Sequence, residues 1–298
     1  MADRTPSAGI TPGAVDVGDV RLHYLEAGEG PLVLCLHGFP DHAPTFRPLL
    51  GTLAAAGFRA VAPFMRGYTP STVGATSYES AALAGDAIGL AEALAGGAPV
   101  RLVGHDWGGV ASLHAAAWRP DRVARVVTLA IPHAAAFARA LRRDREQLRR
   151  FWYGFVFLAQ GFSERVVSDD GFAFIDALVA EWSPQPPFPP EELEAIKRTL
   201  GATGVLSAAL GYYRAAFRSD RRDPALAEAA ALWAEPVGVP TLAIFGAEDG
   251  CIGPEVSESQ GEHFTGEYRR EVVPGAGHWP HREARELVEP MIVDWLAA

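Results

Sequence analysis

The sequence has little cysteine, a shortage of positive charge and no long hydrophobic run. Two cysteines in 298 residues cannot form a disulfide framework, so we expect reduced thiols. The formal net charge of −10 disfavours nucleic acid or an anionic membrane as the main partner. Residues 1–13 lack the basic start and apolar stretch of a signal peptide, and no apolar run is long enough to span a bilayer. A soluble, cytoplasmic protein is therefore expected.

Short apolar runs alternate with helical stretches, which predicts an α/β fold. A hairpin is expected over 15–27, because two short runs flank Gly18-Asp19, a dipeptide suited to a tight turn. Continuous apolar strands separated by helices indicate a mostly parallel sheet covered by helices on both faces. The predicted strands after the hairpin are 31–36, 58–62, 99–103, 123–130, 241–245 and 268–273.

Three helices of this fold have visible boundaries in the sequence. Thr76 and Glu79 form a possible capping box, which would open a helix that runs to about Ala95. A second helix ends near Trp118, and the last one covers about 282–296. Each of these helices follows a predicted strand.

The stretch 133–233 interrupts the alternation of strands and helices. It has no convincing buried strand and is predicted to consist of helices and loops. It also holds 15 of the 29 aromatic residues in about a third of the chain. We therefore predict an α/β core in two parts, 1–132 and 234–298, with a helical insertion at 133–233 between them.

The strand–turn–helix at Gly104-His105-Asp106-Trp107-Gly108 carries the clearest chemical signal. Glycines two residues before and after the centre permit a sharp turn that exposes the central side chain at a helix N-terminus. A carboxylate there needs no base to deprotonate it and can attack directly to form an ester. The alternative is an Asp that only caps the helix. The motif predicts Asp106 as a nucleophile.

A second turn, His37-Gly38-Phe39-Pro40, follows the first buried strand. Such a turn can aim a backbone N–H at a developing negative charge. Together with the N–H of Trp107, the N–H of Phe39 would then form an oxyanion hole. The alternative is an ordinary Gly-Pro turn.

Two loops that follow the last two strands offer a base and an acid. His278 lies on the glycine-flanked loop 275–280 and is the predicted base; His281 is the less favoured alternative. Asp249 is the predicted partner of the histidine, with Glu248 as the runner-up, because a carboxylate can hold a histidine in the required tautomer. The chain order is nucleophile, acid, histidine, as in α/β-hydrolases.

With these motifs in place, the sequence resembles α/β-hydrolases of the soluble epoxide hydrolase and haloalkane dehalogenase branch, over about 15–296. The resemblance implies an α/β-hydrolase fold in which the insertion is a cap over the active site. The motifs that carry it are His37-Gly38-Phe39-Pro40, Arg66-Gly67-Tyr68, Gly104-His105-Asp106-Trp107-Gly108-Gly109 and Gly277-His278.

Epoxide hydrolases of this kind carry two cap tyrosines that hydrogen-bond the epoxide oxygen. The segment Phe151-Trp152-Tyr153-Gly154-Phe155 is similar to the first tyrosine segment and implies Tyr153. The segment Gly211-Tyr212-Tyr213-Arg214 is similar to the second and implies Tyr213, although Tyr212 stands where the family usually has Trp. Tyr212 therefore stays open as the second donor.

The resemblance implies an epoxide hydrolase that forms an ester on Asp106 and hydrolyses it with water activated by His278. The aromatic insertion suggests an apolar aryl or alkyl epoxide. Substrate contacts are expected from His37, Pro40 and Trp152. We expect no metal and no organic cofactor, and a monomer or homodimer.

Other activities use similar residues. A haloalkane dehalogenase would need a second halide donor beside Trp107, and Phe39 stands where relatives often have Asn; Trp152 or another cap tryptophan would have to substitute. A fluoroacetate-type dehalogenase usually has Arg at the position of Trp107, and a serine esterase needs Ser in place of Asp106. A non-catalytic binder would keep the cavity without the chemistry.

Overall fold

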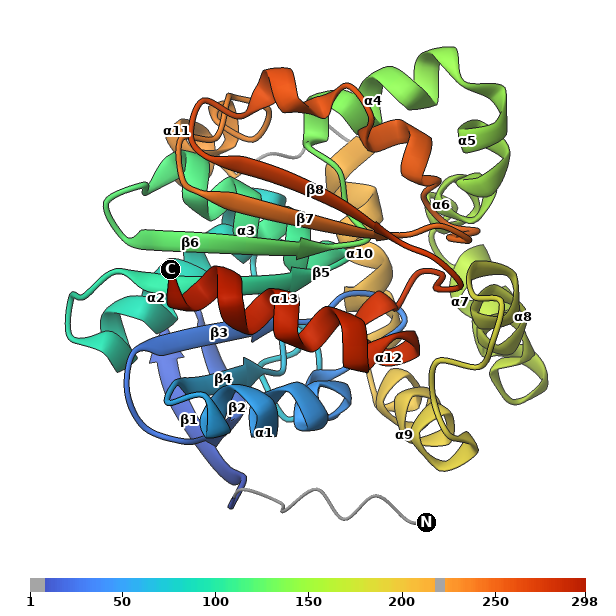
Figure 1. Cartoon of the computed structure of the whole chain (residues 1–298). Helices are drawn as coiled ribbons and strands as arrows, with labels where there is room; N and C mark the ends of the chain where they lie inside the picture. The colour runs from blue at the N-terminus through green and yellow to red at the C-terminus, as the bar shows by residue number, and fades with distance from the viewer. Residues whose placement is uncertain (1–8, 218–222) are drawn as a thin grey trace, which may run out of the picture.

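An eight-stranded sheet forms the centre of the protein (Figure 1). The computed structural model describes residues 9–217 and 223–298. The strand order is β1-β2-β4-β3-β5-β6-β7-β8; β2 pairs antiparallel with β1 and β4, and the other neighbours are parallel. The mostly parallel sheet predicted from the sequence is confirmed. Its strands are β1 (Thr11–Val17), β2 (Val20–Ala27), β3 (Leu32–Leu36), β4 (Arg59–Pro63), β5 (Val100–His105), β6 (Val123–Leu129), β7 (Thr241–Gly246) and β8 (Tyr268–Val273).

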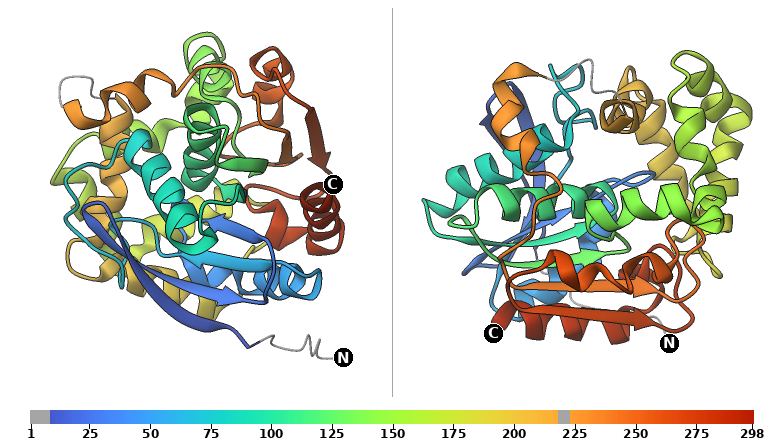
Figure 2. Two further views of the ribbon diagram at one scale, coloured as in Figure 1. Left: turned by 90° about the vertical axis from the view of Figure 1, so that its left-hand side faces the viewer. Right: turned by 90° about the horizontal axis from the view of Figure 1, so that it is seen from above.

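Helices cover both faces of this sheet (Figures 1 and 2). Successive side chains of a strand point to opposite faces, so each buried strand contributes to two hydrophobic layers. In β3, Cys35 points into the layer with α1 and α13, and the adjacent Leu34 points into the layer with α2 and α3. These helices are α1 (Arg47–Ala55), α13 (Arg285–Ala297), α2 (Ser80–Ala95) and α3 (Trp107–Trp118).

Between β6 and β7 the described chain consists of helices joined by loops, and α4 to α10 gather beside the carboxyl ends of the parallel strands, whereas α11 lies farther back along the sheet (Figure 1). Loops at the carboxyl ends of parallel strands are where open α/β sheets place their ligands. No helix in the described part of the chain has both the length and the apolar character that a membrane crossing requires. The helices of this insertion are α4 (Ala134–Arg143), α5 (Arg145–Arg150), α6 (Trp152–Phe157), α7 (Phe162–Ser168), α8 (Ala173–Trp182), α9 (Pro190–Gly201), α10 (Val205–Phe217) and α11 (Ala227–Ala231).

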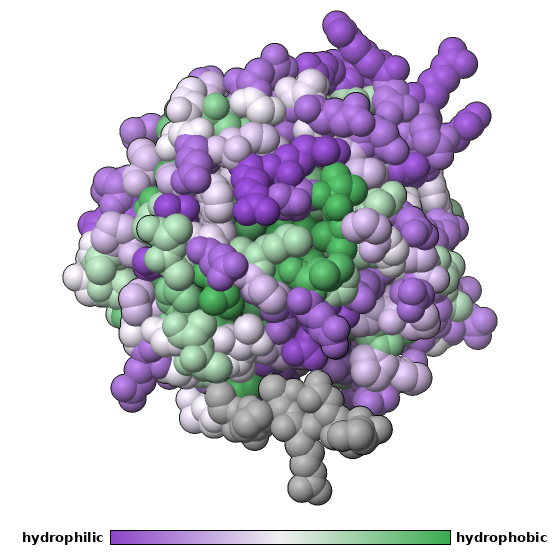
Figure 3. Space-filling model, in the orientation of Figure 1, coloured by the Kyte–Doolittle hydropathy of each residue, from purple (hydrophilic) through white to green (hydrophobic). Residues whose placement is uncertain are grey.

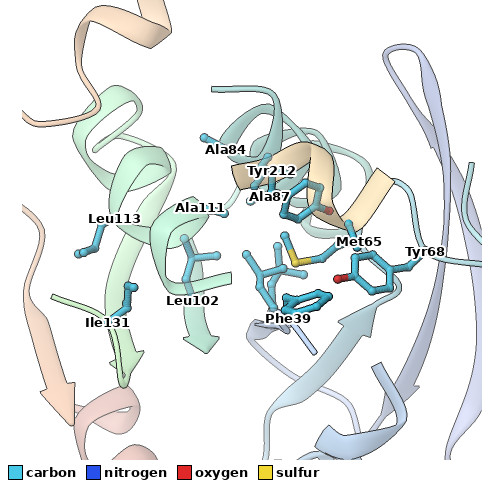
Figure 4. Packing of buried hydrophobic residues seen from close by; sticks show 14 of the residues in the cluster. Phe39, Met65, Tyr68, Ala84, Ala87, Leu102, Ala111, Leu113, Ile131 and Tyr212 are labelled. Atoms are coloured by element: carbon cyan, nitrogen blue, oxygen red, sulfur yellow. The ribbon is translucent and has the colours of Figure 1, made fainter. Parts of the chain in front are cut away.

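The insertion and the sheet share one hydrophobic core. Tyr212 of α10 lies beside Met65 and Tyr68, which follow β4, and the cluster continues to Leu102 of β5 (Figure 4). The Tyr68 and Tyr212 rings are 6.2 Å apart between centroids. Because side chains from both parts are fully buried against each other, the insertion is held in a defined position over the strand ends.

Two predicted helix starts differ from the structure. The capping box at Thr76 is wrong: α2 begins at Ser80, and the Thr76 hydroxyl and N–H both donate to Asp19 Oδ2, at 2.7 and 3.0 Å. A carboxylate from the β1–β2 turn therefore takes the bonds that a cap would use. The C-terminal helix is also divided, with a short α12 (Pro280–Glu283) before α13.

Two glycine substitutions test the close packing of α3 on the sheet. A Cβ at Gly108 would lie 2.0 Å from the Leu36 carbonyl oxygen, so Gly108→Ala should lower the free energy of unfolding by about 3 kcal/mol. Gly85 in α2 has open space around the position of a Cβ, so Gly85→Ala should raise the free energy of unfolding by about 0.5 to 1 kcal/mol. Urea unfolding measures both; equal stability of the two variants would contradict the close packing.

Candidate active site

Asp106 occupies a strained turn between β5 and α3. Its φ of 49° and ψ of −120° lie in a region that non-glycine residues rarely adopt. Asp106 is nevertheless buried, with only 5% of its surface exposed. The turn requires glycine nearby: a Cβ at Gly104 would lie 2.2 Å from the Gly108 oxygen, and one at Gly38 would lie 2.2 Å from Asp106 Oδ1. The close approach of three backbone segments therefore presents this carboxylate at the N-terminus of α3.

The two oxygens of Asp106 have different environments. Oδ1 accepts a hydrogen bond of 2.8 Å from the backbone N–H of Phe39. Oδ2 faces His278 Nε2 at 3.8 Å. The N–H of Trp107, at the first residue of α3, has no acceptor within the helix. The two predicted oxyanion donors thus lie on the Asp106 turn and on the adjacent loop, and one of them already contacts the carboxylate.

His278 and Asp249 are brought together by the loops after β8 and β7. The ring N–H at Nδ1 donates to Asp249 Oδ2 at 2.9 Å. Asp249 Oδ1 accepts from the backbone N–H groups of Cys251 and Ile252 at 2.7 and 2.9 Å, which fixes the carboxylate. Of the two adjacent candidates for the acid, Glu248 is exposed, so the structure pairs the histidine with Asp249.

The alternative base, His281, lies in a different environment. Its ring stacks on Phe46 with centroids 5.2 Å apart. Burial, with the charges of His105 and Arg282, holds the pKa of His281 well below its usual value. The carboxylate partner that a base requires belongs to His278 instead.

Charge coupling sets the protonation of the central pair. Burial alone would raise the pKa of Asp106, but the positive charge of His278, whose Nε2 lies 3.8 Å away, outweighs it and lowers that pKa. Burial alone would lower the pKa of His278, but the Cys251, Asp249 and Asp106 side chains around the ring outweigh it and raise that pKa well above its usual value. Both shifts favour the charged pair, an Asp106 carboxylate facing a protonated His278 ring.

Tyr153 of α6 and Tyr213 of α10 bring hydroxyl groups from the insertion to this site. Tyr153 Oη lies 3.0 Å from Cys251 Sγ, and Tyr213 Oη is buried with no hydrogen-bond partner in the described structure. The neighbouring Tyr212 instead donates to the Arg66 carbonyl at 2.6 Å. Of the two adjacent tyrosines, the structure leaves the hydroxyl of Tyr213 available. Burial raises the pKa of Tyr153 and Tyr213 well above the usual value, so both are neutral donors.

A cavity of about 180 Å³ joins these groups. Its lining includes the polar residues Asp106, Tyr153 and Tyr213, and also Trp107, whose indole N–H is buried without a partner in the described structure. Aliphatic and aromatic side chains form the rest. The full lining is Asp106, Trp107, Val110, Ile131, Phe137, Ala138, Leu141, Phe151, Tyr153, Tyr213, Ala216, Phe217, Trp233 and Ile252.

The three residues predicted to contact substrate lie outside this lining. His37 is fully buried and fixes its own loop, because Nε2 accepts from the Met65 N–H at 3.1 Å. Burial lowers the pKa of His37 to about 4, so the ring is neutral. Trp152 is 40% exposed and packs on Phe174. Pro40 is buried on the loop beyond Phe39 and is also absent from the lining.

Trp182 was not predicted, yet it connects several parts of the site. Its carbonyl accepts from the His278 N–H at 3.0 Å, and its ring lies 5.1 Å from the His278 ring and 4.7 Å from that of Tyr153. No motif marks Trp182, because its role comes from contacts between distant segments. The sequence also gives no sign that Cys251 lies at the site, because it shows only a loop that follows a strand.

One set of potential metal ligands occurs in the described structure. Asp249, Cys251 and His278 each offer a ligand atom, and these atoms lie within 4.8 Å of one another. All three residues are buried.

The chain is similar to known hydrolases over nearly its whole length. The profile of the alpha/beta hydrolase fold family matches residues 31–284. "AB hydrolase superfamily protein YfhM" of Bacillus subtilis (strain 168) is 27% identical, covering 97% of this chain and 98% of that protein. "Epoxide hydrolase 3" of Mus musculus is 30% identical, covering 91% and 73%. The solved structure of a Bacillus megaterium epoxide hydrolase with an inhibitor is 27% identical, with a TM-score of 0.82, covering 96% and 100%.

The coupling of Asp106 and His278 predicts a measurable pKa change. Asp106→Asn removes a negative charge 3.8 Å from His278 Nε2, so the pKa of His278 should fall and the ring should become neutral at lower pH. NMR titration of labelled histidines measures this. Glu248→Gln removes an exposed carboxylate from the same loop as Asp249 and should leave His278 unchanged. A His278 titration that is the same in Asp106→Asn and wild type would refute the coupling.

Proposed function

The chain belongs to the alpha/beta hydrolase fold family, and we propose that it is an epoxide hydrolase that works through a covalent ester on Asp106. One observation carries the proposal: a single cavity holds the Asp106 carboxylate together with Tyr153 and Tyr213. Opening an epoxide needs a nucleophile at carbon and a proton donor at oxygen. Neutral phenols facing a carboxylate supply both.

The cavity supports a compact apolar substrate. Its volume of about 180 Å³ is smaller than the roughly 300 to 1,000 Å³ typical of sites for drug-sized ligands. Its walls are largely aliphatic and aromatic, for example Val110, Ile131, Phe137 and Phe151. We therefore expect a small aryl or alkyl epoxide and water as the substrates.

In the first step, Asp106 opens the epoxide ring. Oδ1 is held by the Phe39 N–H, which leaves Oδ2 to attack a ring carbon. The bond from that carbon to the epoxide oxygen breaks, and the oxygen takes a proton from Tyr153 or Tyr213. The ester removes the charge of Asp106, so the pKa of His278 falls, and the proton that His278 releases restores the tyrosine.

In the second step, His278 activates water. Its Nδ1–H remains bound to Asp249, so Nε2 takes a proton from water as the water oxygen attacks the ester carbon. The charge that develops on Oδ1 is stabilised by the N–H groups of Phe39 and Trp107. The ester bond then breaks and the diol leaves with a proton from His278. The carboxylic acid of Asp106 returns its proton to His278, which restores the resting pair.

The helical insertion acts as a cap in this proposal. Residues 133–233 would form the cap, and 1–132 with 234–298 the catalytic core. Support comes from α6 and α10, which carry Tyr153 and Tyr213 over the Asp106 turn, and from the hydrophobic core that joins the insertion to the sheet. The cap thus supplies the proton donors, and the core supplies the nucleophile and base.

A haloalkane dehalogenase is the second candidate, since Trp107 lines the same cavity and its indole N–H is buried without a partner in the described structure. Halide binding needs a second N–H donor. Trp152, expected for that role, lies outside the lining, and Trp233 is a partly exposed member of it. The cavity lining therefore offers two phenol donors, Tyr153 and Tyr213, but only one buried indole donor, Trp107, and this set suits an epoxide oxygen better than a halide.

The covalent step can be observed directly with His278→Gln and a small aryl epoxide such as styrene oxide. Loss of the base should allow the ester to form but not to hydrolyse, so peptide mass spectrometry should find the adduct on Asp106. The Asp106→Asn, His278→Gln double variant is the matched control and should carry none.

Other outcomes of that experiment discriminate between the candidates. No adduct, together with no turnover of an epoxide panel by the wild type, would rule out the epoxide reaction. Halide release from a haloalkane panel would then support the dehalogenase, and saturable binding without consumption of either panel would support a non-catalytic binder.

The adjacent tyrosines provide a second test. Tyr153→Phe and Tyr213→Phe should each lower kcat/KM by about 100-fold, because each removes a donor to the leaving oxygen. Tyr212→Phe should leave kcat/KM close to wild type, because that hydroxyl bonds the Arg66 carbonyl away from the cavity. Steady-state kinetics measures all three; a larger loss in Tyr212→Phe than in Tyr213→Phe would reverse the assignment.

A further inference from the structure

Cys251 lies at the proposed reaction centre without a part in the reaction. Its backbone N–H donates to Asp249 Oδ1, and its carbonyl accepts from Gln147 Nε2 at 2.9 Å, so the loop holds the residue on both sides. Its Sγ is fully buried and lies 3.0 Å from Tyr153 Oη. The adjacent Ile252 and Tyr153 both line the cavity, which places the thiol directly behind the cavity wall.

The thiol completes a set of three different ligand types. A carboxylate oxygen, a sulfur and an imidazole nitrogen from Asp249, Cys251 and His278 lie within 4.8 Å of one another. Donors around a tetrahedral zinc ion are about 3.3 to 3.6 Å apart, so side-chain rotations that close the gaps by about 1 Å would complete a site. The ring nitrogen of His278 on the Asp249 side is Nδ1, which lies 2.9 Å from Asp249 Oδ2, so a cation at this site would bind Nδ1 in place of its proton.

We propose that Asp249, Cys251 and His278 form an inhibitory site for a thiophilic divalent cation such as Zn²⁺ or Cd²⁺. A sulfur, nitrogen and oxygen donor set is characteristic of zinc sites, whereas Mg²⁺ and Ca²⁺ prefer oxygen ligands alone. Binding forms bonds from the metal to the sulfur, to Nδ1 of His278 and to the Asp249 carboxylate. It releases the thiol proton and the Nδ1 proton of the imidazolium to solvent, with no change in oxidation state.

The consequence for catalysis rests on the proposed function. A cation on His278 Nδ1 replaces the hydrogen bond to Asp249 that orients the ring, and the one remaining ring proton stays on Nε2, which then cannot accept a proton from water. Water activation therefore stops. Asp106, which is outside the ligand set, keeps its nucleophilic oxygen, so epoxide turnover should halt with the ester retained on Asp106.

Metal binding can be measured without any substrate. Titration of the reduced wild-type protein with Cd²⁺ should produce the ultraviolet cadmium–thiolate absorption band with one ion per chain, and Zn²⁺ should abolish that band by competition. Cys251→Ala should show no band. Cys35→Ala is the matched control: Cys35 is equally buried but lies within β3, away from any partner ligand, so this variant should behave as the wild type.

Further variants distinguish a three-ligand site from a lone thiol. His278→Gln and Asp249→Asn should each weaken Cd²⁺ binding at least 10-fold, with circular dichroism confirming that each variant is folded. A band that persists in Cys251→Ala, or an affinity unchanged in both His278→Gln and Asp249→Asn, would overturn the site. Failure of epoxide turnover with an intact band would reject the proposed function and leave the metal site standing.

Discussion

The whole site depends on how closely three backbone segments approach one another at Asp106. The residue has a left-handed φ of 49°, and glycine at 38, 104 and 108 lets β3, β5 and α3 meet within distances that no Cβ would permit. The Phe39 N–H, which donates to Oδ1, adds a hydrogen bond that orients this carboxylate. The cost of the strained turn is met by the packed sheet and helix on either side, which over-determine the backbone there.

Burial makes the charges of the three proposed catalytic residues depend on one another. Asp106, His278 and Asp249 are removed from water, so each charge is stabilised mainly by its neighbours and the loss of one changes the pKa of the next. The proposed reaction uses this coupling: when the Asp106 charge disappears into an ester, His278 becomes a base. The coupling is also why a cation on His278 and Cys251 would halt the cycle between its two steps.

The insertion illustrates how packing separates residues that look alike. Tyr212 and Tyr213 are adjacent on α10 and both are buried. The Tyr212 hydroxyl is bonded to the Arg66 carbonyl, whereas Tyr213 lines the cavity with Asp106 and its hydroxyl has no hydrogen-bond partner in the described structure. The Tyr212 bond anchors α10 to the sheet domain and so sets the direction of Tyr213. Trp182 acts similarly from α8, where its carbonyl and ring hold the His278 loop.

The sequence by itself determined the parallel sheet, the insertion and the candidates Asp106, Asp249 and His278, because strand–turn–helix signals are local and the ends of parallel strands meet at one edge. It did not determine which side chains face the cavity. Only the tertiary structure decided that Tyr213 and not Tyr212 is available, that His37 and Trp152 lie outside, and that Thr76 bonds Asp19. Those outcomes depend on contacts between residues far apart in the chain, and no local pattern encodes them.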